Sequence, residues 1–120
     1  MPANNKSPNR ASIGAKAEAE ARRYLEKSGL IFITANESCK HGEIDLIMKD
    51  KDTYVFVEVR YRKHAQFGGA LESITPSKQE KVRRSALYYL QKQKLYEKHP
   101  IRFDVVAMQA EECTWLQGAF

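Results

Sequence analysis

The sequence predicts an α/β fold, a mixed β-sheet flanked by helices in the order α-β-β-β-α-β-β. Two segments, about residues 12–28 and 75–96, repeat apolar side chains at the spacing that is typical of helices. The predicted strands are short runs rich in β-branched and aromatic residues, at 30–35, 43–49, 53–60, 101–108 and 113–116. A chain of 120 residues is long enough for one sizeable core and too short for two domains.

The first helix is expected to begin at Ser12, a good N-cap residue, and to end at Ser28, with Gly29 as its C-terminal stop. Its buried stripe is predicted from helical spacing to consist of Ile13, Ala17, Ala21, Tyr24 and Leu25. Residues 1–10 are polar and contain two prolines. We therefore expect a flexible arm there, followed by a single domain at 11–120.

The predicted strand at 30–35 leads into the polar stretch NESCKHG, which is expected to form a turn. The next two strands are joined by the short polar segment KDKD and should form a hairpin. A long irregular link with a Gly68-Gly69 pair then leads to the second helix, which starts at Thr75 with Pro76 in the first helical position. Its buried face is predicted to consist of Gln79, Val82, Ala86, Tyr89 and Leu90.

Two carboxylates lie in strands that are otherwise apolar. Asp45 interrupts the run GEIDLIM, and Glu58 interrupts VFVEV. Because side chains alternate along a strand, Glu43 shares a face with Asp45, and Arg60 shares a face with Glu58. The opposite faces are expected to be Ile44, Leu46 and Met48 in one strand and Val55, Val57 and Val59 in the other. If the hairpin register brings Asp45 beside Glu58, two acids and a cation meet on one surface.

Two half-buried carboxylates repel each other unless something neutralises them. A divalent cation does so, since Mg²⁺ prefers oxygen ligands and commonly takes one or two carboxylates. The alternative is structural: Glu58 pairs with Arg60 or Arg62, and Asp45 caps a turn or pairs with a lysine. The spacing alone leaves both interpretations open.

Five stretches resemble one known family: GAKAEAEARRYLEKSG, GEIDLI, VFVEVRYR, ITPSKQEKVRRSALYYL and RFDVVAM. They are similar, in the same order over about residues 12–118, to the YraN family of small bacterial proteins. That family is classed by fold with the restriction-endonuclease-like PD-(D/E)XK nucleases and archaeal Holliday junction resolvases. The resemblance implies a nucleic-acid-binding protein that uses Mg²⁺ or Mn²⁺ to hydrolyse phosphodiester bonds of DNA, with branched DNA among the candidate substrates.

The resemblance also implies roles for individual residues. Asp45 would be the first acid of the motif and a metal ligand, and Glu58 would be the second. The main-chain carbonyl of Val59 would be a further ligand. Glu18, on the first helix, matches the acid that resolvase-like relatives contribute from that helix.

Arg60 occupies the position of the motif lysine, which is a departure from the superfamily pattern. Arginine binds phosphate through two N–H groups but is almost never deprotonated, so it cannot act as a base. It can still orient water, or Lys78 at the start of the second helix can substitute for the lysine. The departure leaves open a non-catalytic nucleic-acid-binding module with a decayed site, and an adaptor whose basic face meets an acidic protein is a third alternative.

The net charge of +5, from 20 Lys and Arg against 15 Asp and Glu, is compatible with a nucleic-acid partner. Lys78, Lys81 and Lys92 share one flank of the second helix, where they would either contact phosphates or form a solvated helix face. A basic segment that follows the second acid has the same two interpretations and consists of Tyr61, Arg62, Lys63 and His64. A protein that cuts two strands symmetrically would be a homodimer.

The remaining polar and aromatic residues are expected to be structural. Cys39 and Cys113 lack paired spacing and should be reduced, partly buried thiols, because a zinc site would need Cys39 and His41 to recruit Cys113 and His99 from distant segments. Asp104 is expected to hold Arg102. Phe103 and Trp115 are expected in the core.

No apolar run reaches the ~18 residues of a membrane-spanning helix, so we expect no membrane segment. The first ten residues, MPANNKSPNR, lack the apolar centre of a secretory signal. A cytoplasmic location is therefore expected.

Overall fold

The computed structural model describes residues 10–62, 72–109 and 112–120. Its elements are α1 (Arg10–Lys27), β1 (Ile31–Cys39), β2 (Gly42–Asp50), β3 (Thr53–Arg62), α3 (Pro76–Lys92), β4 (Ile101–Gln109) and β5 (Glu112–Leu116). The predicted α/β class and the order α-β-β-β-α-β-β are confirmed.

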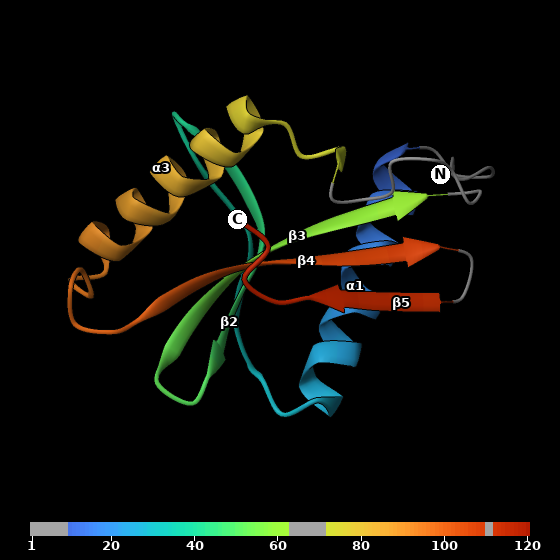
Figure 1. The fold of residues 1–120 in the computed structure, drawn as a ribbon, viewed down its shortest axis with the longest axis horizontal. Coiled ribbons are helices and arrows are strands. Elements are labelled where there is room, and N and C mark those ends of the chain that lie inside the picture. Colours follow the sequence, from blue (N-terminus) through green and yellow to red (C-terminus); the bar gives the residue numbers. More distant parts are fainter. Residues whose placement is uncertain (1–9, 63–71, 110–111) are drawn as a thin grey trace, which may run out of the picture.

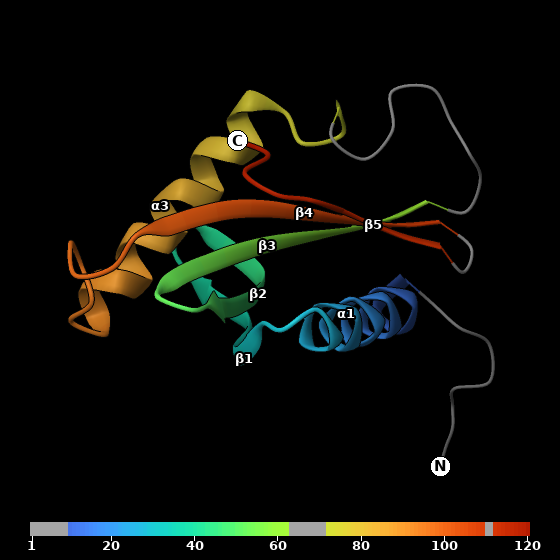
Figure 2. The same cartoon turned by 60° about the horizontal axis from the view of Figure 1, so that its bottom comes forward.

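The five strands form one mixed sheet in the order β1-β2-β3-β4-β5. Neighbouring strands are antiparallel except β3 and β4, which are parallel. Helix α1 packs on one face of the sheet, and α3 lies across the other face, over β2 and β1 (Figures 1 and 2). In the described ranges, no helix has both the length and the apolar content needed to cross a bilayer.

The two helices create a core on each face of the sheet. The core under α1 contains Ala17, Ala21, Leu25, Leu46, Met48, Val55, Val57 and Val59. The core under α3 contains Ile44, Ile47, Tyr54, Phe56, Ala86, Tyr89 and Leu90. Strand β3 lies in the middle of the sheet and contributes alternate side chains to both cores, which explains its nearly continuous apolar sequence.

Helix α1 begins earlier than predicted, at Arg10, so Ser12 lies inside the helix and is not its N-cap. The predicted stop is confirmed, with the helix ending at Lys27. Gly29 has a φ of +105°, which favours glycine, and the N–H of the next residue, Leu30, donates back to the Leu25 carbonyl at 3.0 Å.

The predicted stripe of α1 is confirmed at Ala17, Ala21 and Leu25, which are buried. Tyr24 was expected to be buried and is 37% exposed. It lies at the margin of the core, where its ring meets the edge of the Trp115 ring with centroids 6.4 Å apart. The side chain of Ile13 lies outside the described residues.

Strand β1 is longer than predicted, because residues 36–39 were expected to form a turn and instead pair with β2. Cys39 lies opposite Gly42, so the connection consists of Lys40 and His41. β1 is an edge strand of the sheet, where side chains meet solvent, and a polar sequence is compatible with strand structure there.

Helix α3 begins as predicted, with Pro76 in its first turn and the Thr75 hydroxyl accepting a hydrogen bond from the Lys78 N–H at 3.1 Å. It ends at Lys92 and not near Tyr96, as predicted. The chain leaves the helix there because Lys94 adopts a left-handed conformation, with a φ of 60°.

The buried face of α3 contains the predicted Val82, Ala86, Tyr89 and Leu90. Gln79 is only half-buried, since its side chain donates to the Ile74 carbonyl at 3.1 Å. Ser85 is buried in addition. The link predicted around Gly68-Gly69 lies outside the described residues.

Candidate active site

The two acids that interrupt the hairpin lie at the end of its regular pairing. The β2–β3 ladder runs from Asp50 opposite Thr53 to Leu46 opposite Val57. The next position along the two strands holds Asp45 and Glu58. There Asp45 Oδ2 accepts a hydrogen bond of 2.8 Å from the main-chain N–H of Val59, so the Asp45 side chain reaches across to β3.

The alternation of β2 changes beside Asp45. Ile44 was expected to share a face with Leu46 and Met48, but it packs with Ile47 in the core under α3, whereas Leu46 and Met48 lie under α1. Two residues therefore separate Ile44 from Ile47 where regular alternation has one. This irregularity falls at Asp45, and it explains why the strand pattern misassigned Ile44.

The Glu58 side chain is buried, with 1% exposure. Among the described side chains, its two carboxylate oxygens are the only buried polar atoms without a hydrogen-bond partner. The nearest cations are Arg60 Nη2 and Lys78 Nζ, each 3.7 Å from Glu58 Oε1. Glu58 therefore forms ion pairs with both, including the pair with Arg60 that the structural alternative predicted, although the distances exceed those of charge-assisted hydrogen bonds.

Burial and, after it, the nearby Asp45 carboxylate raise the pKa of Glu58 from 4.5 to about 7, while Lys78, Arg60 and the main-chain N–H of Asp45 act in the opposite direction. The pKa of Asp45 is also raised, mainly by burial, although the Val59 N–H and the two cations oppose this. Two interacting carboxylates with raised pKa values are typical of functional sites.

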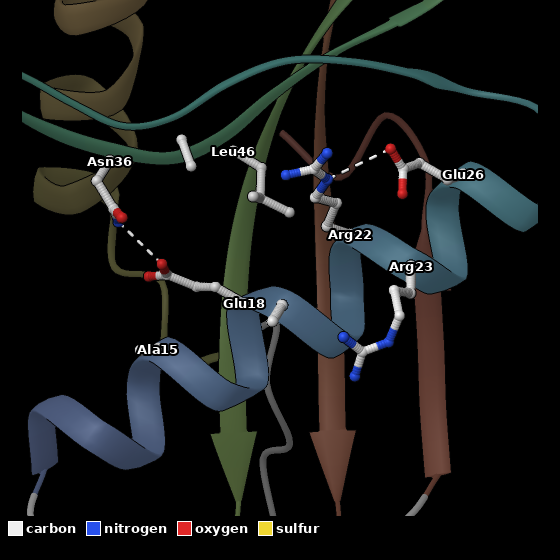
Figure 3. Close-up of a pocket in the computed structure, with 9 residues that line it drawn as sticks. Ala15, Glu18, Arg22, Arg23, Glu26, Asn36 and Leu46 are labelled. Carbon is white, nitrogen blue, oxygen red and sulfur yellow. Dashed lines mark hydrogen bonds and ion pairs between the residues drawn. The ribbon is translucent and has the colours of Figure 1, made fainter.

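Glu18 approaches this pair from α1. Its carboxyl group is close enough to that of Asp45 for the two to interact, and its Oε1 accepts a hydrogen bond of 2.9 Å from Asn36 Nδ2 on β1. Burial is the main cause that raises the Glu18 pKa, and Asp45 and Glu43 add to it, whereas the Asn36 amide lowers it. A hollow of about 400 Å³ lies beside Glu18 and Asn36, between α1 and β1 (Figure 3).

Arg60 is oriented by a residue that the sequence did not indicate. Its Nε donates a hydrogen bond of 3.2 Å to Ser73 Oγ, just before α3. This bond fixes the guanidinium at the same side of Glu58 that Lys78 approaches from α3. Neither Ser73 nor Asn36 stood out in the sequence, because both lie in segments interpreted as loops without periodicity.

Two predicted phosphate contacts lie elsewhere. Lys81 is exposed on α3 beside the β1–β2 turn. Lys92 lies fourteen residues beyond Lys78, about 21 Å along the helix, and pairs with Glu37 of β1 at 3.4 Å. The structure therefore brings Lys78, but not Lys92, to the acids. The side chain of Arg62, and all of Lys63 and His64, lie outside the described residues.

The site offers few side chains that could coordinate a divalent ion. No group of three or more His, Cys, Asp and Glu residues suited to a metal occurs in the part of the chain that the structure describes. Mg²⁺ needs fewer, since one or two carboxylates, water and substrate phosphate commonly complete its coordination. The unpaired oxygens of Glu58, beside Asp45, fit that requirement.

Asp104 and the cysteines are not part of this cluster. Asp104 is fully buried and accepts hydrogen bonds from Arg102, the Trp115 indole and the Gly118 N–H, all between 2.9 and 3.3 Å, which confirms its structural role. Cys39 and Cys113 are half-buried free thiols, as predicted, on the two opposite edge strands of the sheet. Phe103 and Trp115 pack against the cores, also as predicted.

Comparison with known proteins identifies the family. The model of the family described as "Uncharacterised protein family UPF0102" matches residues 17–108. A UPF0102 protein of Shewanella frigidimarina is 51% identical over 107 residues, which cover 89% of this chain and 97% of the relative. UPF0102 proteins of Stutzerimonas stutzeri and Pseudomonas putida are each 50% identical, over 113 and 119 residues, covering 91% and 95% of this chain and 94% and 95% of theirs. The chain therefore belongs to the UPF0102 family, which is the YraN family that its sequence resembles.

Proposed function

We propose that this protein is a divalent-metal-dependent nuclease that binds DNA and hydrolyses its phosphodiester bonds. The observation that carries the proposal is Glu58, a buried carboxylate whose two oxygens have no hydrogen-bond partner, next to a second acid and between two cations. A buried charge in this state destabilises the folded protein. Its presence is understandable if the carboxylate is completed by a bound cation during function.

The metal ligands in this proposal are Asp45 and Glu58, with the main-chain carbonyl of Val59 as a further donor. Bound Mg²⁺ or Mn²⁺ would supply a Lewis acid and lower the pKa of its bound water. Asp45 is kept in place by the Val59 N–H, which donates to one of its oxygens. The raised pKa values of both acids support the proposal, because a cation favours their ionised forms.

The two cations would act on the phosphate. Arg60, fixed by Ser73, is suited to bind the scissile phosphate through its N–H groups and to stabilise charge that develops there. Lys78 approaches Glu58 as closely as Arg60 does. Lys78 would therefore be able to take over the role of the motif lysine of the superfamily, whose position in this chain is occupied by Arg60.

In this proposal, the net positive charge of the chain would favour its binding along a DNA duplex. Lys81, one helical turn beyond Lys78, and Arg62 would contact backbone phosphates without reading bases. A second candidate, a nucleic-acid-binding module without catalysis, is favoured by one observation, the arginine at the lysine position. The two candidates differ in whether metal-dependent cleavage occurs.

The test is a cleavage panel with the purified protein, Mg²⁺ or Mn²⁺, and labelled branched DNA, single strands, duplex ends and RNA. We expect cleavage of at least one DNA substrate that a chelator stops and that Asp45→Ala lacks. Binding that weakens steeply with salt, without cleavage in any arm, would instead support the second candidate. Absence of salt-dependent binding would contradict both.

A further inference from the structure

Asn36 has an unusual place in an exposed edge strand. Its φ of 53° is left-handed, a conformation that asparagine tolerates better than most residues other than glycine. The flanking pairs, Ala35 with Leu46 and Glu37 with Ile44, put Asn36 opposite Asp45 across the β1–β2 ladder. The backbone thus turns at the point of β1 that faces the first acid of the candidate site.

The Asn36 side chain links three elements. Its amide donates to Glu18 Oε1 of α1 at 2.9 Å (Figure 3). The Glu18 carboxyl group in turn interacts with that of Asp45 on β2. Without such a donor, the half-buried Glu18 side chain would turn away from Asp45, since two carboxylates repel each other. The hydrogen bond from Asn36 therefore holds the Glu18 carboxylate beside Asp45, although repulsion between the two carboxylates disfavours that position.

Glu18 accepts this hydrogen bond from a neutral amide and not from a cation. Arg22 lies one turn beyond Glu18 on the same helix and is spaced to pair with it. Instead, Arg22 pairs with Glu26 at 3.3 Å, and its guanidinium lies 3.6 Å from the centre of the Phe32 ring. Glu18 is thus held by a neutral amide, which orients the carboxylate without cancelling its charge. A structural link between α1 and β1 would gain more from a cation.

We propose that Asn36 is a positioning residue that holds the Glu18 carboxylate beside Asp45 and thereby strengthens divalent-cation binding at the Asp45–Glu58 site. The inference rests on the proposed function, because it assumes that this site binds metal. It adds a residue that acts through Glu18 and makes no contact with the metal itself.

The test is a double-mutant cycle on Mn²⁺ affinity, measured by calorimetric titration or from the resonance signal of free Mn²⁺. Asn36→Gly deletes the amide and keeps the left-handed backbone, and at an exposed site it is expected to fold. It should weaken Mn²⁺ binding ~10-fold, the lower end of what loss of an outer-shell partner commonly costs, because Glu18 acts on the ligand Asp45 through its charge. The loss should disappear in the Glu18→Gln background, since Asn36 acts through Glu18.

Ser38→Ala is the matched control. It removes another exposed hydrogen bond from β1 to an acid, Ser38 Oγ to Glu43 Oε2 at 3.3 Å, and should leave Mn²⁺ affinity within about twofold. An unchanged affinity in Asn36→Gly, or an equal loss with and without Glu18, would overturn the inference while metal binding stands. Absence of saturable Mn²⁺ binding in the wild-type protein would overturn the metal site and the inference together.

Discussion

Replacing Glu58 by glutamine removes one buried charge and keeps the shape of the side chain. In the metal-free folded protein the pKa of Glu58 is raised from 4.5 to about 7. Between these values the folded state binds more protons than the unfolded state, so the free energy of unfolding falls as pH rises. The destabilisation is complete above pH 7, where Glu58 is ionised in both states.

The size of this effect follows from the same two pKa values. At ~1.4 kcal/mol for each pKa unit, the difference between 4.5 and about 7 corresponds to about 3.5 kcal/mol. Near pH 5 the glutamine variant should therefore be nearly as stable as the wild-type protein. At pH 8 its free energy of unfolding should be higher by up to about 3.5 kcal/mol.

Urea denaturation between pH 5 and pH 8.5, in the presence of a chelator, measures this difference directly. Groups that do not interact with Glu58 titrate alike in both proteins and cancel in the comparison, whereas Asp45 interacts with Glu58 and contributes to the difference. Glu80→Gln, which changes an exposed acid paired with Arg84, is the matched control and should give no pH-dependent difference. Adding Mn²⁺ should stabilise the wild-type protein at pH 8 and not the Glu58 variant.

The opposite outcome would refute the reasoning. If Glu58→Gln lowers the free energy of unfolding by several kcal/mol at pH 8, the ionised carboxylate is stabilised by Arg60 and Lys78 as a structural ion pair. The metal proposal would then lose the observation on which it depends.

Three further predictions concern neighbouring residues. Asp45→Asn should leave the metal-free protein as stable as the wild type or more stable in urea denaturation, because it relieves repulsion between the acids, and it should abolish Mn²⁺ binding in titrations. Arg60→Ala should reduce the cleavage rate ~100-fold or more with little effect on DNA affinity, and Arg60→Lys should keep much of the activity. Equal rates for wild type, Arg60→Ala and Lys78→Ala would contradict both catalytic assignments. Asp104→Ala should lower the free energy of unfolding by about 1–3 kcal/mol in urea, because the half-buried Arg102 guanidinium and Trp115 indole lose their acceptor, although Arg102 keeps Asp50 as a partner.

The sequence predicted the fold because its signals are local. Two amphipathic segments and five strand-like runs are visible within short windows, and Pro76 and Gly29 mark helix ends by their own conformational limits. The errors occur where tertiary contacts override those signals. The polar NESC segment forms part of β1 because β2 offers it a partner, and α3 ends early because Lys94 turns out of the helix.

The candidate site was only partly visible for the same reason. Asp45, Glu58 and Arg60 stand out as charges in apolar strands, and the resemblance to a known family added Glu18 and Lys78. The hydrogen bonds that orient Glu18 and Arg60 come from Asn36 and Ser73, which are distant in sequence and lie in irregular segments. No periodic pattern marks a residue whose role depends on a partner eighteen or thirteen positions away.

Two buried acids in the same sheet, Asp104 and Glu58, differ in how far hydrogen bonds satisfy their carboxylate oxygens. Asp104 on β4 and Glu58 on β3 lie in neighbouring parallel strands, and both are at most 1% exposed. The oxygens of Asp104 accept hydrogen bonds from a guanidinium, an indole and a main-chain N–H. No donor in the described part of the chain meets hydrogen-bond geometry at those of Glu58, where the main-chain N–H of Asp45 acts more weakly than the two cations do. The fold is thus able to satisfy a buried carboxylate completely. Arg60 and Lys78 lie 3.7 Å from Glu58, and the Asp45 carboxylate interacts with it. Because the fold can satisfy a buried carboxylate, we attribute the missing hydrogen bonds of Glu58 to the ligand that we propose binds there.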